Sequence, residues 1–117
     1  MQNFKELVVW EKGHQFTLKV YEVTKEYPRE EIFSLTTQIR RAAYSIPANI
    51  AEGCGRSTQK ELANFLQISL GSANECEYFL LLSKDLKYLN EETYREMQIE
   101  INSIKAMLIK LIAKVRL

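Results

Sequence analysis

The chain has 117 residues, of which 46% are hydrophobic, which is enough for one domain with a real core and too few for two. Lys and Arg number 16 against 15 Asp and Glu, so the net charge of +1 excludes a global field that would draw the chain onto nucleic acid or an anionic membrane. The longest apolar runs are far shorter than the roughly 20 residues that span a bilayer. Charged residues interrupt the N-terminus before a signal-peptide core forms, so we expect a cytoplasmic protein that makes no membrane contact.

Two helices are predicted in the first half of the chain. The first runs from about Lys5 to Tyr27, where apolar residues recur at helical spacing until Pro28 disfavours helical geometry. The second starts near Glu30 and ends at the two glycines of "GCGR". Its apolar face carries Ile32, Leu35, Ile39, Ala42, Ala43, Ile46 and Ile50.

Two longer helices are predicted in the second half. The third begins at "STQKE", because Thr58 and Glu61 have the spacing of a capping box. Its apolar face carries Leu62, Phe65, Leu66, Ser69, Ala73, Cys76, Leu80, Ser83 and Leu86. The fourth begins after Asn90, an N-cap residue, and its apolar face carries Tyr94, Met97, Ile101, Ile104, Leu108, Leu111 and Val115.

Four amphipathic helices with short connections predict an all-α fold, an antiparallel up-down-up-down four-helix bundle over residues 1–117. Apolar residues also lie beside the main faces, among them Tyr44, Ile68, Tyr78, Ile99 and Ile109. Oligomerisation is a natural way to bury this extra apolar surface. The plainer alternative is that a small bundle has wide core faces.

A polar stripe runs along the second helix opposite its apolar face. It is formed by Gln38, Arg41, Ser45, Asn49, Glu52 and Arg56. Pro47 lies inside the same helix and removes the hydrogen bond to the carbonyl of Ala43, at a cost of roughly 3 kcal/mol in an isolated helix. We expect the helix to continue through Pro47, with Ile46 and Ile50 buried. We expect Ser45 or Asn49 to satisfy the freed groups, and Asn49 and Glu52 to form side-chain hydrogen bonds. A solvated face with a tolerated proline is the alternative.

The third helix contains small and polar residues in "SLGSANECE", which offer carboxylates to Arg40 and Arg41 on an antiparallel neighbour. A buried pair there would fix the register of the two helices more than it would stabilise the fold. The alternative is a partly exposed salt bridge, which would contribute little to either. The predicted polar network or subunit interface therefore comprises Arg40, Arg41, Ser45, Pro47, Asn49, Glu52 and Glu75.

The segments "LTTQIRRAAYSIPANIAEGCGR" and "KELANFLQISLGSANECEYFL" closely resemble the signature of a bacterial four-helix bundle family, named for proteins encoded in intervening sequences of 23S ribosomal RNA genes. The resemblance extends from "VWEKGHQ" through the fourth helix. It implies a homopentameric ring of left-handed bundles with no established enzymatic activity. A related group, accessory to diversity-generating retroelements, forms a basic pentameric barrel that binds nucleic acid and its reverse transcriptase. This chain departs from that group in being nearly neutral.

Catalytic and metal chemistry is not indicated by the sequence. A di-iron bundle needs Glu-x-x-His on two helices, and the only histidine, His14, can complete one such motif, with Glu11, but not a second. Cysteine catalysis needs a histidine beside Cys54 or Cys76, but Cys76 falls on the apolar face and Cys54 lies between two turn glycines. We therefore expect no enzyme, no cofactor and no metal site.

Two functions remain. The first is an RNA- or DNA-binding accessory protein, and its candidate contacts are Arg40, Arg41, Arg56, Lys105, Lys110, Lys114 and Arg116, of which the last four follow the final acidic residue, Glu100. The second is a protein-interaction scaffold that recruits a nucleic-acid enzyme or a ribosomal component. The plain interpretation of the four C-terminal cations is that they complement the dipole of the last helix.

Overall fold

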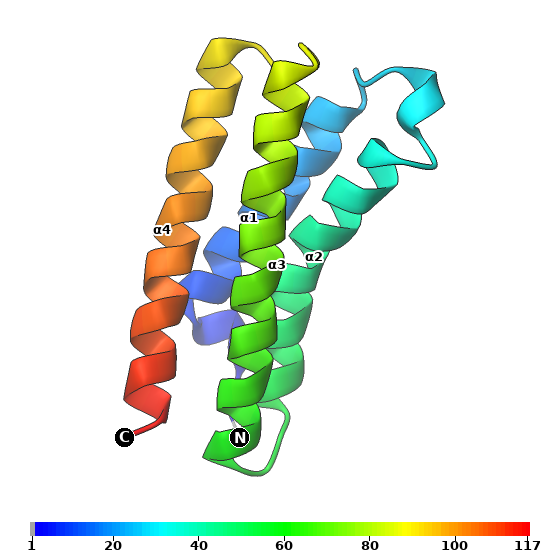
Figure 1. The fold of residues 1–117 in the computed structure, drawn as a ribbon. Coiled ribbons are helices and arrows are strands. Elements are labelled where there is room, and N and C mark those ends of the chain that lie inside the picture. The colour runs from blue at the N-terminus through cyan, green and yellow to red at the C-terminus, as the bar shows by residue number, and fades with distance from the viewer. Residues whose placement is uncertain (1) are drawn as a thin grey trace.

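The computed structural model describes residues 2–117 and contains four α-helices: α1 (Val8–Thr24), α2 (Leu35–Cys54), α3 (Gln59–Asp85) and α4 (Glu91–Val115). Two short 3-10 turns, η1 (Phe4–Glu6) and η2 (Arg29–Glu31), precede α1 and α2. Figure 1 shows that the chain reverses direction at each connection, so that both termini and the α2–α3 turn lie at one end. Each helix packs against the next one along the chain, and α1 also packs against α4. The predicted all-α fold with four helices is confirmed.

The predicted N-terminal boundaries of the first two helices are wrong. The first helix begins at Val8, because residues 4–6 form a separate 3-10 turn, and it ends at Thr24. The second begins at Leu35 and not near Glu30, so Ile32 is half exposed in the connection. Leu86 also leaves the predicted apolar face, because it follows the last residue of α3 and is exposed.

The caps of the last two helices form as predicted. The Thr58 hydroxyl accepts a hydrogen bond from the Glu61 amide at 3.1 Å, and the Asn90 side chain accepts one from the Thr93 amide at 2.8 Å. The core then lies between the four helices. Its largest fully buried side chains include Phe16, Ile39, Ile46, Ile50, Leu66, Leu80, Met97, Ile101, Ile104 and Leu108.

Helix α2 continues through Pro47, and a neighbouring helix supplies the missing hydrogen bond. The hydroxyl of Thr17 on α1 lies 3.1 Å from the Ala43 carbonyl, which has no amide partner at position 47, and 2.8 Å from the carbonyl of Gly13. On the opposite side, the Ser69 hydroxyl on α3 donates to the Ile46 carbonyl at 2.9 Å. Both contacts are buried. The partner of the freed carbonyl is thus Thr17, whose single hydroxyl proton is shared with the nearer Gly13 carbonyl. The sequence indicated Ser45 or Asn49 instead, but Asn49 donates to the Ser45 carbonyl.

Two glycines allow the neighbouring helices to approach α2 this closely. A Cβ atom on Gly13 would lie 3.2 Å from Cγ2 of Ile46, at the crossing of α1 and α2. A Cβ atom on Gly53 would lie 2.9 Å from Cβ of Phe65, at the crossing of α2 and α3. A side chain at Gly53 would force its neighbours to shift, and one at Gly13 would require Ile46 to move slightly, so both glycines help to set the spacing of the bundle.

The Thr17 contact predicts a thermodynamic coupling with Pro47. Thr17→Val removes the hydroxyl and leaves the Ala43 carbonyl buried and unpaired, so we expect the free energy of unfolding to fall by about 1–3 kcal/mol. In a Pro47→Ala background the restored amide at position 47 satisfies that carbonyl, and Thr17→Val should cost clearly less. Urea denaturation of the four proteins of this double-mutant cycle measures the coupling.

Thr17→Ser is the matched control, because it retains the hydroxyl and should weaken the protein less than Thr17→Val. An equal loss for Thr17→Val in both backgrounds would show that the hydroxyl does not compensate for the proline.

Candidate nucleic-acid interface

The polar stripe of α2 forms several local contacts along the edge of the helix that faces α3. The Asn49 side chain donates to the Ser45 carbonyl at 2.8 Å within α2 itself. Arg41 donates to Gln38 at 3.2 Å and lies 3.8 Å from the Glu75 carboxylate on α3. Glu52 lies 3.6 Å from Arg56, which is an ion pair and not the expected hydrogen bond. These contacts are exposed or half exposed, so the stripe is a series of pairs and not one buried network.

Arg40 points away from α3, although it is adjacent to Arg41 in sequence. Its Nε donates to the Thr24 hydroxyl on α1 at 2.8 Å, and its guanidinium group lies 4.8 Å from the centre of the Tyr21 ring. Successive helical residues differ by about 100° around the axis, so neighbouring arginines reach different helices. Only Arg41 therefore contacts a carboxylate of α3.

The cations near the end of α4 also separate around the helix. Lys105 turns toward α3 and pairs with Glu77 at 2.6 Å, half buried. Lys110 and Lys114 lie on the side facing α1, at the rim of an apolar groove lined by Leu7, Val8, Val9, Met107 and Leu111. Arg116 caps the C-terminus of α4 and lies beside the start of α3. The four residues predicted as one patch thus lie in three different places: beside α3, at the groove facing α1, and beside the start of α3.

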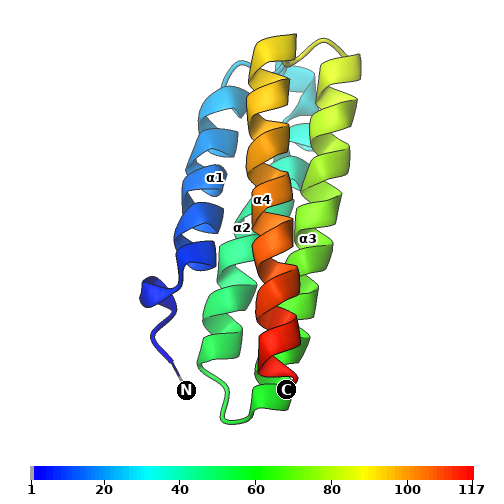
Figure 2. The same ribbon diagram turned by 90° about the vertical axis from the view of Figure 1, so that its left-hand side faces the viewer.

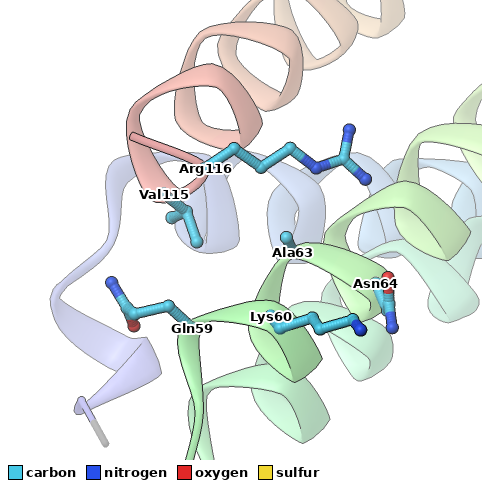
Figure 3. Close-up of a pocket in the computed structure, with 6 residues that line it drawn as sticks. All are labelled: Gln59, Lys60, Ala63, Asn64, Val115 and Arg116. Carbon is cyan, nitrogen blue, oxygen red and sulfur yellow. The ribbon is translucent and has the colours of Figure 1, made fainter.

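A pocket of about 400 Å³ lies between the first turns of α3 and the last turn of α4. Figure 3 shows its lining side chains, with Lys60 extending toward Asn64 along one wall and Arg116 extending from α4 along the facing wall. Gln59, Ala63 and Val115 complete the lining, which contains no carboxylate. Lys60, Gln59 and Asn64 were not identified from the sequence. The sequence predicted that α3 begins at a cap directly after a short turn. In an up-and-down bundle the start of α3 lies beside the end of α4, and this could have identified these residues.

We refer to Arg56, Lys60, Lys110, Lys114 and Arg116 as the basic end, because they lie at the end of the bundle that holds both termini (Figure 2). Within residues 2–117, Lys60, Lys110, Lys114 and Arg116 form no salt bridge, whereas Arg56 pairs with Glu52 and lies over the Phe65 ring. Glu61, the acid nearest in sequence to Lys60, accepts a hydrogen bond from the Thr58 hydroxyl at 3.0 Å. The cations of this end are therefore largely available to an anion.

The two cysteines are buried, and the histidine is stacked on an aromatic ring. Cys54 and Cys76 are free and buried, and burial raises the pKa of both thiols, with the nearby charge of Glu75 adding to the rise for Cys76. His14 stacks on Trp10, with the ring centres 5.2 Å apart. Across the described part of the chain, His, Cys, Asp and Glu form no group of three that could hold a metal ion. No described helix has the length and apolarity needed to cross a membrane.

The helical arrangement and the sequence both match proteins already known. Residues 5–110 match the family model described as 23S rRNA-intervening sequence protein. The chain belongs to this family. A crystal structure of a protein of unknown function from the S23 ribosomal protein family of Bacteroides thetaiotaomicron is similar, with a TM-score of 0.84 and 32% sequence identity. The match covers 91% of this chain and 96% of that one. Among curated proteins, none shows significant similarity.

Membership of the 23S rRNA-intervening sequence family confirms the resemblance drawn from the motifs of the second and third helices. The family description and the similar structure name no enzymatic activity. Of the residues assigned to the polar network, Arg41 and Glu75 meet across the α2–α3 crossing, while Arg40 contacts α1.

Burial of the two cysteines predicts that neither thiol reacts in the folded protein. The nucleophile is the thiolate, and a raised pKa keeps both groups protonated near neutral pH. A chromogenic disulfide reagent at about pH 8, close to the ordinary thiol pKa, should report almost no reaction in native buffer. In strong denaturant it should report both thiols at once. Rapid reaction of one thiol in the native protein, assigned by comparing Cys54→Ser with Cys76→Ser, would contradict this arrangement.

Proposed function

We propose that this protein is a non-enzymatic, cytoplasmic accessory protein that binds RNA or DNA as a homopentameric ring. The observation that carries the proposal is the basic end, where cations from α3 and α4 gather without a carboxylate in the lining of the pocket between them. Phosphate contacts by Lys and Arg dominate the affinity of proteins for nucleic acid. A ring would present five copies of this surface, which would offset the net charge of only +1 per chain.

Exposed apolar side chains support assembly into a ring. Large hydrophobic residues are exposed by about half or more on several helices, including Val8 at 62%, Ile68 at 52%, Tyr78 at 56% and Ile99 at 69%. Subunit contacts would remove these side chains from water. The same side chains favour the second candidate, a scaffold that binds a nucleic-acid enzyme or a ribosomal component through apolar contacts.

The candidate contacts of α2 and of the middle of α4 have weaker support. Arg40, Arg41 and Lys105 already have partners within the chain, so recruiting them would break existing contacts. Lys60, Lys110, Lys114 and Arg116 have no such partner among residues 2–117, and we assign the main phosphate contacts to them.

Binding to structured RNA should depend on salt and on the basic end. The logarithm of the affinity should fall with the logarithm of salt concentration, and Lys110→Glu with Lys114→Glu should reduce the slope by roughly 0.7–0.9 for each phosphate that the protein no longer neutralises. Fluorescence anisotropy at several salt concentrations measures both affinity and slope.

The matched control for RNA binding changes Arg29→Glu and Lys87→Glu. These cations lie at the opposite end of the bundle, form no salt bridge among residues 2–117, and alter the net charge by the same amount. The control pair should lower affinity far less than the pair on α4. Equal effects would show that only the total charge matters, and absence of binding at low salt would favour the scaffold.

Assembly is tested by the mass in solution. Multi-angle light scattering should give about 69 kDa, five times the 13.7 kDa of one chain. The mass should not change on moderate dilution, because an obligate assembly of this kind buries large apolar contacts. A mass of one chain at every concentration would contradict the ring.

A further inference from the structure

The pocket between α3 and α4 combines two cations, two amides and an apolar wall. Lys60 and Gln59 come from the first turn of α3, Asn64 from the second, and Arg116 from the end of α4. Figure 3 shows that Arg116 approaches from one side of the pocket and Lys60 from the other. The ammonium and guanidinium groups are donors only, and each amide can also donate. This set of donors suits a ligand that offers several acceptor oxygens and negative charge.

We propose that this pocket binds the terminal phosphate of an RNA strand, a phosphomonoester at the chain end. This inference rests on the proposed nucleic-acid binding and names the part of the ligand that the pocket recognises. Arg116 would hold two phosphate oxygens through its planar fork, and Lys60 would hold a third as a point charge. Asn64, which lies beside the end of the Lys60 side chain in Figure 3, can donate to a remaining acceptor, whereas Gln59 lines the opposite side of the pocket.

The charge of the pocket favours a terminal phosphate over an internal one. A phosphomonoester carries about −1.5 to −2 at pH 7 and three acceptor oxygens, whereas each internal phosphodiester carries one negative charge. The two cations of the pocket match the monoester. Ala63 and Val115 form an apolar wall on which the terminal ribose or base can rest, and the volume of about 400 Å³ leaves room for more than the phosphate itself.

The acids around the start of α3 are engaged elsewhere. Glu61 accepts the hydrogen bond of the Thr58 hydroxyl in the N-cap of α3, and Glu52 pairs with Arg56. Neither lines the pocket. A bound phosphate therefore does not have to displace a carboxylate from Lys60 or Arg116.

The test compares single-stranded RNAs of one sequence that carry a 5′-phosphate, a 3′-phosphate or a hydroxyl at both ends, labelled internally. The protein carries no affinity tag, so that no added residue lies beside Arg116. At moderate salt, anisotropy should show an RNA with a terminal phosphate binding about tenfold more tightly than the hydroxyl form, the effect of one charge-assisted hydrogen bond. Arg116→Gln and Lys60→Gln should each remove most of this preference.

Lys110→Gln is the matched control, because Lys110 lies at the same end and outside the pocket. It should weaken all three RNAs alike and leave the preference intact. Equal binding of the three RNAs by the unaltered protein would overturn this inference and leave the proposed function standing. Failure of every RNA to bind at low salt would overturn both.

Competition separates a strand end from a free anion. A nucleoside monophosphate should displace the phosphorylated RNA at lower concentration than inorganic phosphate does, because it also contacts the wall formed by Ala63 and Val115. Inorganic phosphate competing equally well would overturn the assignment to a strand end, since the pocket would then be a simple anion site.

Discussion

The carbonyl of Ala43 is the constraint on which the geometry of this bundle depends. Pro47 removes the amide that would normally satisfy it, and the group is buried where water does not reach. The Thr17 hydroxyl satisfies it from α1 at 3.1 Å, which requires the close approach that Gly13 permits. This contact ties α1 to one side of α2, and the Ser69 hydroxyl ties α3 to the other side.

Helical periodicity was sufficient to predict the apolar faces, because each face is a regular repeat that the core buries. Thr17 was missed for a physical reason. The hydroxyl of a threonine within a helix usually donates to a carbonyl of its own helix, and nothing in the sequence shows that this one also reaches a second helix. Ile32 was misplaced because its spacing fits the face of the second helix, whereas the connection through η2 begins that helix at Leu35.

The candidate site was also only partly predictable from the sequence. Lys105, Lys110, Lys114 and Arg116 form a run without acids in the sequence, yet rotation about α4 directs Lys105 to Glu77 and Arg116 to the pocket that Lys60 also lines. Lys60 came from a distant part of the chain and had no motif of its own. The near-neutral net charge also hid a separation along the bundle, whose other end carries the acidic pairs Glu30 with Glu31 and Glu91 with Glu92. The net charge describes the whole chain, whereas binding depends on where the fold brings the charged side chains together.

The hydrogen bonds on the two sides of Pro47 also bear on how the bundle folds and opens. Helix α2 receives one side-chain donor from α1 and another from α3, on carbonyls three residues apart. A hairpin of α1 and α2 alone would lack the second donor, and one of α2 and α3 would leave the Ala43 carbonyl unpaired. Partial structures are therefore penalised on either side, which ties the first three helices into one cooperative unit. The amides of α2 should open to solvent only when that whole unit does.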